Sequence, residues 1–401
     1  MNRLLLLLFA VTLLFSYDAT TKIKLLGDPY KVVYETKKDL YAKNIWDMAV
    51  FENKIYLGAG NSSNEGPTQN AGPVPLISYN PTTNEFKTEA IIQDEQIDII
   101  KIFDNKMYIP GHDAKENWDF ANFYIKEFNQ SVKKYRNIKD GLHVYDVALH
   151  DNKIFLALGV KNGAAVAISS DNAQNWEIQK LDHYRINSFL EVGDRFFATK
   201  HFPSSSDLQK MSQSRKKLFF SVAEYETSKG FIPNYKLDSE DFFPKTTDLK
   251  DKSRKIVRSV KMNDKTIYIG AYAHNDHQFE PFGVYYISSA GKNLDIKKIT
   301  LSSQYKVWDI LKKENALYLL AYDETKKEVK VFFAKNGDFE SFKEYFSFKS
   351  DSFARSFELF EDKFYFSLGG AIKDSKNFSY DEVSEDTGKI LQFDTKNITN
   401  E

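Results

Sequence analysis

A set of polar and aromatic residues in this sequence stands at two adjacent positions of a repeated pattern, at the start of an apolar strand candidate. These residues are Trp46, Asp47, Asp98, Tyr145, Asp146, Arg258, Trp308, Asp309 and Arg355. Carboxylates and guanidinium groups bind polar and charged partners, and aromatic rings pack their apolar faces on the rings of sugars. The set therefore predicts a site for a small polar or carbohydrate-like ligand.

A second set of candidate residues lies in the longer polar loops of the repeat. It comprises His112, Asp113, Trp118, His274 and His277. Histidine and carboxylate groups can act as acids, bases or metal ligands, but the spacing of His274, Asp276 and His277 matches no known metal motif, even with His112 or Asp113 added. We therefore predict no bound metal and no cofactor, and we expect the loops to contact the ligand. The alternative is that these loops are only hydrophilic surface segments that contact no ligand.

Composition and motifs exclude several kinds of chemistry. The chain has no cysteine, so disulfides, thiol catalysis and Cys-based metal sites are ruled out. Its formal charge is -1, from 55 basic and 56 acidic side chains, so no overall field attracts nucleic acid. The sequence also lacks a Gly-x-Ser-x-Gly elbow, a Gly-x-x-x-x-Gly-Lys loop and a dinucleotide-binding Gly-x-Gly-x-x-Gly fingerprint. We expect neither nucleic-acid binding nor nucleotide-dependent chemistry.

The elements that position the candidate residues follow from an internal repeat of about fifty residues. In each copy, an apolar strand, a polar turn rich in Asn, Asp or Gly, and an aromatic strand follow one another. The turns fall at 52–53, 104–105, 151–152, 193–194, 263–264, 314–315 and 361–362. Such turns join the strands of β-hairpins. Two further strand candidates follow, as at 74–80 and 86–92, so each copy predicts a four-stranded blade.

The two ends of the chain predict how the ring of blades closes. The seventh copy supplies only three strands, the last of them at 389–394. The alternating apolar run from Tyr30 to Glu35 stands before the first copy and has no partner. We expect it to complete the seventh blade. The predicted fold is therefore an all-β, seven-bladed β-propeller of four-stranded antiparallel blades, closed by an N-terminal strand.

A propeller brings both sets of candidate residues to one face. The innermost strand of each blade begins on the face that also carries the loops between second and third strands, so the two sets should meet at one channel mouth. Because side chains alternate along a strand, one of the two adjacent positions should face the channel. For the position that holds Asp47, Asp146 and Asp309, hydrogen bonding between neighbouring blades is the alternative.

Two short segments resemble motifs of known propeller families. Residues 54–60 and 79–86 resemble a kelch repeat, as does the double glycine at 369–370. Residues 169–176 resemble the Asp-box, Ser-x-Asp-x-Gly-x-x-Trp, of sialidase-like propellers, with Ala173 in place of its glycine. Both resemblances support the fold, and neither motif holds catalytic residues.

The sialidase-like resemblance also implies a clamp of three arginines for a substrate carboxylate. Arg185, Arg258 and Arg355 begin inner strands in three different blades, although Arg185 aligns two residues earlier than the others. Arginines that pair with neighbouring Asp side chains are the alternative.

The N-terminus predicts export. A short positive region is followed by an apolar run from Leu4 to Phe15, a length typical of a signal peptide and short for a membrane span. We expect residues 1–19 to be a signal peptide, cleaved after Ser16 or Ala19, and residues 20–401 to form one propeller domain. The protein would then be secreted or periplasmic, with no membrane span after cleavage; an uncleaved anchor is the alternative.

Three functions remain open at this stage. The leading hypothesis is the binding of a small-molecule or glycan ligand at the channel mouth. The second is glycoside hydrolysis at the same mouth, because two carboxyl groups at a suitable separation can act as acid, base or nucleophile. The third is a protein-interaction scaffold whose flat face engages a protein partner. The sequence leaves open whether the protein is an enzyme.

Overall fold

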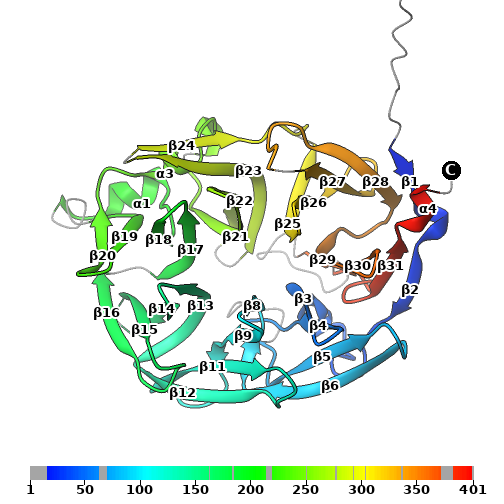
Figure 1. Ribbon diagram of the computed structural model, residues 1–401, viewed down its shortest axis with the longest axis horizontal. Helices are drawn as coiled ribbons and strands as arrows, with labels where there is room; N and C mark the ends of the chain where they lie inside the picture. The colour runs from blue at the N-terminus through cyan, green and yellow to red at the C-terminus, as the bar shows by residue number, and fades with distance from the viewer. Residues whose placement is uncertain are drawn as a thin grey trace, which may run out of the picture.

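The computed structural model describes residues 16–62, 70–161, 163–182, 185–213, 219–249, 251–275, 278–291, 293–302, 304–335, 337–371 and 383–399. Seven β-sheets are arranged in a ring around a common axis (Figure 1). Each sheet is one blade, with its first strand innermost and its last strand on the rim. The seven-bladed, antiparallel propeller predicted from the repeat is confirmed.

The first four blades follow the chain in order. Blade one consists of β3 (Asp47–Phe51), β4 (Lys54–Gly58), β5 (Val74–Asn80) and β6 (Glu85–Ile92). Blade two consists of β8 (Lys101–Phe103), β9 (Lys106–Pro110), β11 (Phe120–Glu127) and β12 (Lys133–Lys139). Blade three consists of β13 (Gly141–His150), β14 (Lys153–Val160), β15 (Gly163–Ser169) and β16 (Glu177–Asp182). Blade four consists of β17 (Ile186–Val192), β18 (Arg195–Lys200), β19 (Val222–Glu226) and β20 (Gly230–Asn234).

The last three blades complete the ring. Blade five consists of β21 (Arg254–Met262), β22 (Lys265–Asn275), β23 (Gln278–Ala290) and β24 (Asn293–Lys298). Blade six consists of β25 (Tyr305–Lys313), β26 (Ala316–Asp323), β27 (Glu328–Lys335) and β28 (Lys343–Lys349). Blade seven consists of β29 (Ala354–Phe360), β30 (Lys363–Leu368) and β31 (Ile390–Asp394) from one end of the chain, and β2 (Lys24–Gly27) from the other.

The predicted hairpin turns form between the first and second strands of the blades. Asn53, Asn105 and Asn152 adopt the left-handed conformation there, each with a φ of 57°. Asparagine tolerates this conformation better than other residues with a Cβ atom, and glycine better still; Gly193 serves the same turn in blade four with a φ of 62°. The Asn and Gly residues of these turns therefore occupy positions that require a left-handed backbone conformation.

An N-terminal strand closes the ring, but not the one predicted. β2 pairs with β31 and completes blade seven, and β1 (Tyr17–Asp18) pairs in parallel with β28 of blade six. The run from Tyr30 to Glu35 forms turns instead. The reason is visible in the burial of Tyr30, whose hydroxyl donates to the carbonyls of Leu57 and Pro75 at 2.9 and 3.1 Å. Tyr30 and Tyr34 are buried against blade one while Val32 is 81% exposed, so this run has no single buried strand face. Pairing with blade seven falls to the preceding residues of β2.

Two short strands extend blade three. β10 (His112–Ala114) pairs with β13 on one side and with β7 (Asp94–Gln96) on the other, so segments that precede and interrupt blade two become a continuation of the blade-three sheet. This extension lies on the face where the inner strands begin, which we call the mouth face. It holds the backbone of His112 and Ala114, on either side of Asp113, in strand pairs.

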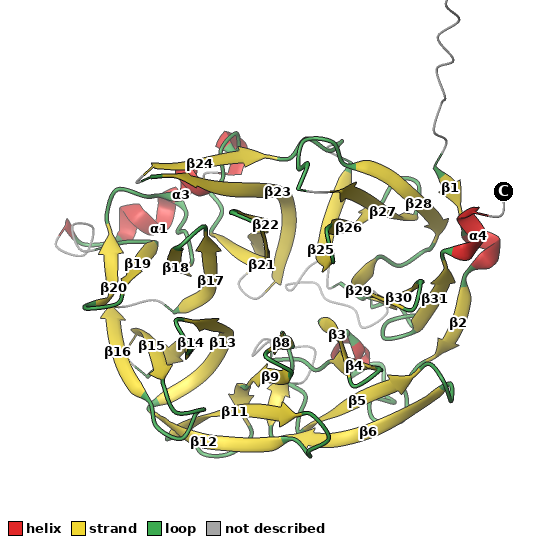
Figure 2. Cartoon of the chain, viewed as in Figure 1, coloured by secondary structure: helices red, strands yellow, loops and turns green. Residues whose placement is uncertain are grey.

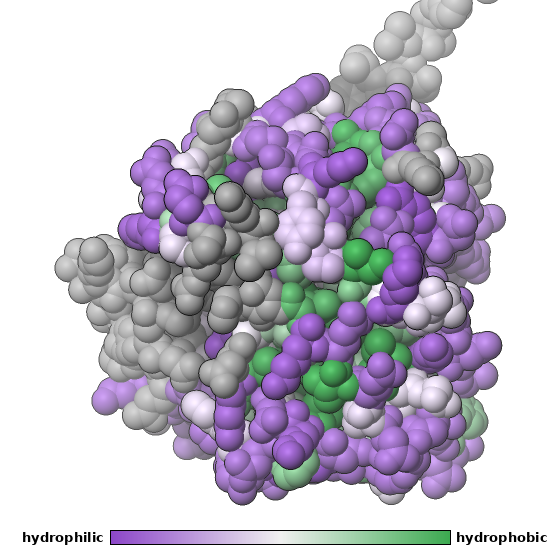
Figure 3. Space-filling view, turned by 90° about the vertical axis from the view of Figure 1, so that its left-hand side faces the viewer, coloured by the Kyte–Doolittle hydropathy of each residue, from purple (hydrophilic) through white to green (hydrophobic). Residues whose placement is uncertain are grey.

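Aromatic side chains fill the spaces between neighbouring blades. Tyr79 of blade one contacts Tyr365 of blade seven with ring centroids 5.9 Å apart, and Phe155 of blade three contacts Phe196 of blade four at 5.1 Å. Burial of such large rings stabilises the contacts between blades. Packing between blades thus accounts for part of the chain's high content of phenylalanine and tyrosine, 33 and 23 residues. Figure 3 shows the flank around β16 and β20, where hydrophilic residues cover most of the surface around a band of apolar ones.

Helices are few and short in the described part of the chain. α1 (Ser205–Lys210), α3 (Ser239–Phe242) and α4 (Lys396–Thr399) lie on the periphery of the ring (Figure 2), and three 3-10 turns complete the set: η1 (Thr20–Lys22), η2 (Leu40–Lys43) and η3 (Thr247–Leu249). Among these described helices, none has the length and apolar character that a membrane crossing requires. Residues 1–15 of the predicted signal peptide lie outside the described residues.

Candidate functional site

The aligned Asp residues of the inner strands join neighbouring blades. Asp47 accepts the backbone N–H of Ile100 in the chain leading to blade two at 2.7 Å, and Asp146 accepts that of Phe189 in blade four at 2.9 Å. Asp309 accepts that of Phe357 in blade seven at 3.3 Å. Each also accepts the N–H of the residue that follows it. The alternative of hydrogen bonds between blades thus describes this position, and their role as ligand contacts stays a prediction.

Arg258 of β21 contacts three other blades. Its Nε lies 3.4 Å from a carboxylate oxygen of Asp309, its Nη2 lies 4.0 Å from a carboxylate oxygen of Asp47, and Nη2 donates to the backbone carbonyls of Trp46 and Asp98. Burial raises the pKa of Asp309 to about 7 even though the charge of Arg258 opposes the rise. Arg258 thus fits the alternative of an arginine paired with neighbouring Asp residues.

Arg355 lies among aromatic rings. Its guanidinium is 4.2 Å from the ring centroid of Trp46, 5.1 Å from that of Trp308 and 5.0 Å from that of Phe353. Nε donates to Asn44 at 2.7 Å and Nη2 donates to the carbonyl of Gly370 at 3.1 Å. Burial lowers the pKa of Arg355 to about 10. Within the described part of the chain, no carboxylate forms an ion pair with this arginine.

The extension of blade three brings two histidines together. In the pairing of β10 with β13, His112 lies directly opposite His143, and residues directly opposite in antiparallel strands carry their side chains on one face. The ring of Tyr145, further along β13, has its centroid 5.3 Å from that of His143 and 5.2 Å from that of His112. Asp113, the middle residue of β10, is buried and adopts a left-handed φ of 64°.

Asp98 orients His112. Its carboxylate lies 2.7 Å from Nδ1 of His112, and Gln96 of β7 donates to the other carboxylate oxygen. Burial lowers the pKa of His112, but the charge and hydrogen bond of Asp98 outweigh this effect and raise it overall. The same pairing holds the pKa of Asp98 well below its usual range despite burial. The mouth face therefore holds an ion pair between Asp98, which precedes blade two, and His112, which lies between β9 and β11 of that blade.

Basic groups continue this set around the mouth face. Arg185, just before β17, is exposed and donates to the hydroxyl of Tyr145 at 2.5 Å. Lys255 of β21 is half-buried with its Nζ 3.8 Å from the ring centroid of Phe279. Burial lowers the pKa of Lys255 to about 8, and Arg185 and Arg258 lower it further, while Asp98 opposes. His201, which also contacts Phe279, has its pKa lowered to about 3, chiefly by burial.

The remaining predicted site residues are distributed as follows. Trp118 is 57% exposed beside the extension of blade three and donates to the carbonyl of Ala114. His277 lies outside the described residues, and so does the side chain of His274. The structure therefore brings together Asp98, His112, Asp113 and Tyr145 on one side of the mouth face. It places Trp46, Trp308 and Arg355 together on another side.

Sequence reasoning missed three residues of this arrangement: Gln96, His143 and Lys255. His143 stands two residues before the aligned position of Tyr145, and it belongs to the site only because β10 joins β13. Lys255 stands three residues before the aligned Arg258. No feature of the repeat marks His143 in the sequence, because its place in the site depends on the pairing of β10 with β13.

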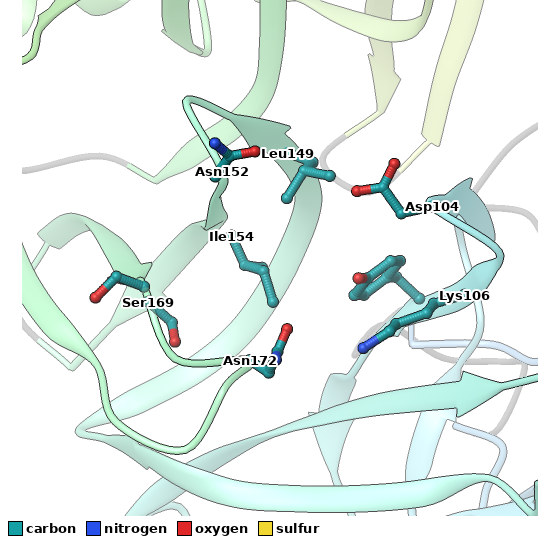
Figure 4. Close-up of a pocket in the computed structure, with 9 residues that line it drawn as sticks. Asp104, Lys106, Leu149, Asn152, Ile154, Ser169 and Asn172 are labelled. Carbon is teal, nitrogen blue, oxygen red and sulfur yellow. The ribbon is translucent and has the colours of Figure 1, made fainter.

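A separate hollow lies on the opposite face, between blades two and three. It has a volume of about 260 Å³ and is lined by the hairpin turns at Asp104 and Asn152 and by the turn that holds Ser169 and Asn172 (Figure 4). The last turn is closed by its own side chains, because Asp171 accepts the N–H of Asn175 at 2.9 Å and Ser169 accepts that of Ala173 at 3.0 Å. The hollow holds none of the predicted site residues.

Comparison with known proteins identifies no family for this chain. No model of a known protein family matches the chain, and no curated protein matches it. Among solved structures, the chain is similar to a computationally designed protein, with 8% identity, 88% of this chain and 96% of that chain covered, and a TM-score of 0.46. A protein from Lactobacillus plantarum is 9% identical, with 78% of this chain and 86% of that chain covered and a TM-score of 0.49. The periplasmic gluconolactonase of Pseudomonas aeruginosa is 10% identical, with 81% of this chain and 94% of that chain covered and a TM-score of 0.41. The likeness to kelch and sialidase-like propellers stays a resemblance.

Proposed function

We propose that this protein is an exported propeller that binds a small hydroxylated anion, such as a sugar acid, on its mouth face. The observation that supports this most is the state of Lys255. Its ammonium group is half-buried against Phe279, and no described carboxylate forms an ion pair with it. Removing an ammonium group from water is costly unless an anion compensates, and a carboxylate of the ligand would supply that charge.

The neighbours of Lys255 favour the same ligand class. Arg185 is exposed and offers further N–H donors, since it donates only to Tyr145 in the described part of the chain. Asp98 and His112 offer hydrogen-bonding groups for hydroxyls, and Tyr145 offers an aromatic ring. A ligand with a carboxylate at one end and hydroxyls at the other matches this sequence of groups.

The geometry gives less support to glycoside hydrolysis. Asp47 and Asp309 are held by backbone amides of two blades and by Arg258. Asp98 and Asp113 lie against histidines. A pair of free carboxyl groups facing one another is what the two-carboxylate mechanism requires. Binding is therefore the function proposed.

The test compares a sugar acid with its neutral counterpart. Glucuronate and glucose differ at one carbon, so calorimetric titration of each into the protein isolates the contribution of the carboxylate. We expect glucuronate to bind and glucose to bind at least ten-fold more weakly, with Lys255→Met reducing the glucuronate affinity at least ten-fold. Lys343→Met, on the exposed surface of β28, is the matched control and should bind as the wild type does. Equal binding of the two sugars, or unchanged binding by Lys255→Met, would contradict the proposal.

A further inference from the structure

His112, Asp113 and His143 place three metal-binding groups at one point. One donor atom from each residue lies within 4.8 Å of the other two. The strand pairing explains why, because His112 and His143 are direct partners across β10 and β13 while Asp113 follows His112 in the chain. The three side chains are held by a paired sheet, and sites on sheets are better defined than sites on free loops.

The orientation of His112 is that of a metal ligand. Its Nδ1 is engaged by Asp98 at 2.7 Å, which leaves Nε2 directed toward Asp113, whose carboxylate oxygen lies 3.9 Å away. Histidines that bind metals almost always use their second ring nitrogen in this way, with a carboxylate as the partner. Gln96 donates to Asp98 in turn, so the orienting carboxylate is itself held.

His143 has a buried ring nitrogen in contact with Asp113. Its side chain is 8% exposed, and its Nδ1 lies against a carboxylate oxygen of Asp113. An imidazole nitrogen and a carboxylate oxygen held this close together in a buried place are donor types that bind one transition-metal ion. Gly159 makes room for the ring, because a Cβ atom at this position would lie 2.8 Å from Cδ2 of His143.

The backbone conformation of Asp113 supports the same metal site. Its φ of 64° is a left-handed conformation that a residue with a Cβ atom adopts at a cost. Strained conformations of this kind persist where a side chain must be aimed at a functional site. Here the conformation turns the carboxylate toward both histidines.

We propose that His112, Asp113 and His143 bind one divalent first-row transition-metal ion. Two imidazoles and one carboxylate suit zinc and its neighbours, whereas calcium and magnesium take oxygen ligands almost alone. Three protein ligands leave coordination positions open for water or a ligand. The site goes beyond the binding of a sugar acid and stands without it, because metal binding is measured with no organic ligand present. The sequence predicted no metal here because the two histidines belong to different blades.

The experiment is a calorimetric titration of metal-free protein with Zn²⁺, followed by Co²⁺ loading and visible absorption. We expect one equivalent of Zn²⁺ to bind and Co²⁺ to develop d–d bands. Asp113→Asn and His143→Gln should each weaken Zn²⁺ binding at least 100-fold. Asp98→Asn, which removes only the orienting partner, should weaken it about 10- to 100-fold. Gly159→Ala should also weaken it, since the added methyl group displaces the His143 ring.

His150→Gln is the matched control, because His150 is a half-buried histidine paired with Glu191 away from this cluster. It should bind Zn²⁺ as the wild type does. Circular dichroism and urea unfolding of the metal-free variants identify any that misfold, and the near-isosteric Asp113→Asn then decides the question. Absence of Zn²⁺ binding by the wild type, or full binding by Asp113→Asn and His143→Gln, would overturn the proposal.

Discussion

Replacement of Arg258 by methionine should destabilise the propeller in a pH-dependent way. The substitution keeps most of the side-chain volume and removes the only cation that contacts both Asp47 and Asp309 in the described part of the chain. Both carboxylates remain between blades, where the backbone hydrogen bonds hold them. They would then be close to one another without a compensating charge.

The magnitude follows from the distances. Coulomb's law with an effective dielectric constant of about 20 gives about 5 kcal/mol for the contact at 3.4 Å and about 4 kcal/mol for that at 4.0 Å, before the cost of desolvation is subtracted. Removing one partner of a buried ion pair typically costs 3–5 kcal/mol. Because the side chain of Arg258 is 20% exposed, water can partly replace it, so we expect a loss of about 3 kcal/mol in the free energy of unfolding at pH 8.

The loss should shrink as the pH falls. The pKa of Asp309 is raised to about 7, so the folded protein binds more protons than the unfolded chain between the ordinary pKa of Asp and pH 7. The free energy of unfolding therefore falls as the pH rises through 7. Arg258 lowers the pKa of both carboxyl groups, so its removal makes this fall larger. At pH 5.5 the carboxyl groups take up protons, and the cost of the substitution should fall to about half.

The assay is urea unfolding followed by tryptophan fluorescence at pH 8 and pH 5.5. Lys327→Met is the control, because Lys327 pairs with Asp351 at 2.7 Å on the exposed surface of blade six. We expect it to cost less than about 1 kcal/mol at either pH. Asp309→Asn added to Arg258→Met should restore part of the stability at pH 8. A loss from Arg258→Met that is the same at both pH values, or below that of Lys327→Met, would refute the reasoning.

Four further predictions concern closure, blade contacts and binding. Asp146→Ala should cost about 3 kcal/mol of unfolding free energy and Asp146→Ser less, because alanine leaves two backbone N–H groups without their acceptor and Lys101 without its carboxylate partner; urea unfolding measures both. Tyr30→Phe should cost about 2 kcal/mol by the same assay, since two buried carbonyls lose their donor. A chain that begins at Thr20 should unfold at lower urea than one that begins at Tyr17, because it lacks β1 and the Ala19 N–H bond to Ser347. Glucuronate affinity should fall as the pH rises through 8, the pKa of Lys255, whereas Lys255→Arg should retain affinity at pH 9 in calorimetric titration.

The propeller could be predicted from local features alone. Each hairpin turn has its own residues with left-handed backbone, and each blade repeats the same four strands. The same sequence pattern therefore recurs in every blade, and each copy supports the prediction from the others. The closing strand could not be identified in this way. β2 is short and partly exposed, whereas the run from Tyr30 to Glu35 has a stronger apolar alternation. In that run Tyr30 and Tyr34 are buried, but Val32, which an extended strand would place on the same face, is 81% exposed. The alternation therefore did not mark a strand.

The candidate site could be predicted in part. Alignment of the inner strands found the position that holds Asp98, Tyr145, Arg258 and Arg355, since that position is fixed relative to each turn. It could not find His143, because the pairing of β10 with β13 joins residues of different blades and leaves no trace in a repeat. It also could not tell which carboxylates face the mouth. Asp146 is 2% exposed and bonds two blades, a distinction that depends on the register of neighbouring sheets.

A crystal structure of the protein grown with glucuronate tests the binding proposal most directly. We expect the sugar acid on the mouth face, with its carboxylate within hydrogen-bonding distance of Lys255 or Arg185. The hollow at Asp104 and Asn152 on the opposite face should remain free of the sugar acid. Glucuronate bound in that hollow, or a mouth face without it at a concentration that saturates the protein in solution, would contradict the proposal.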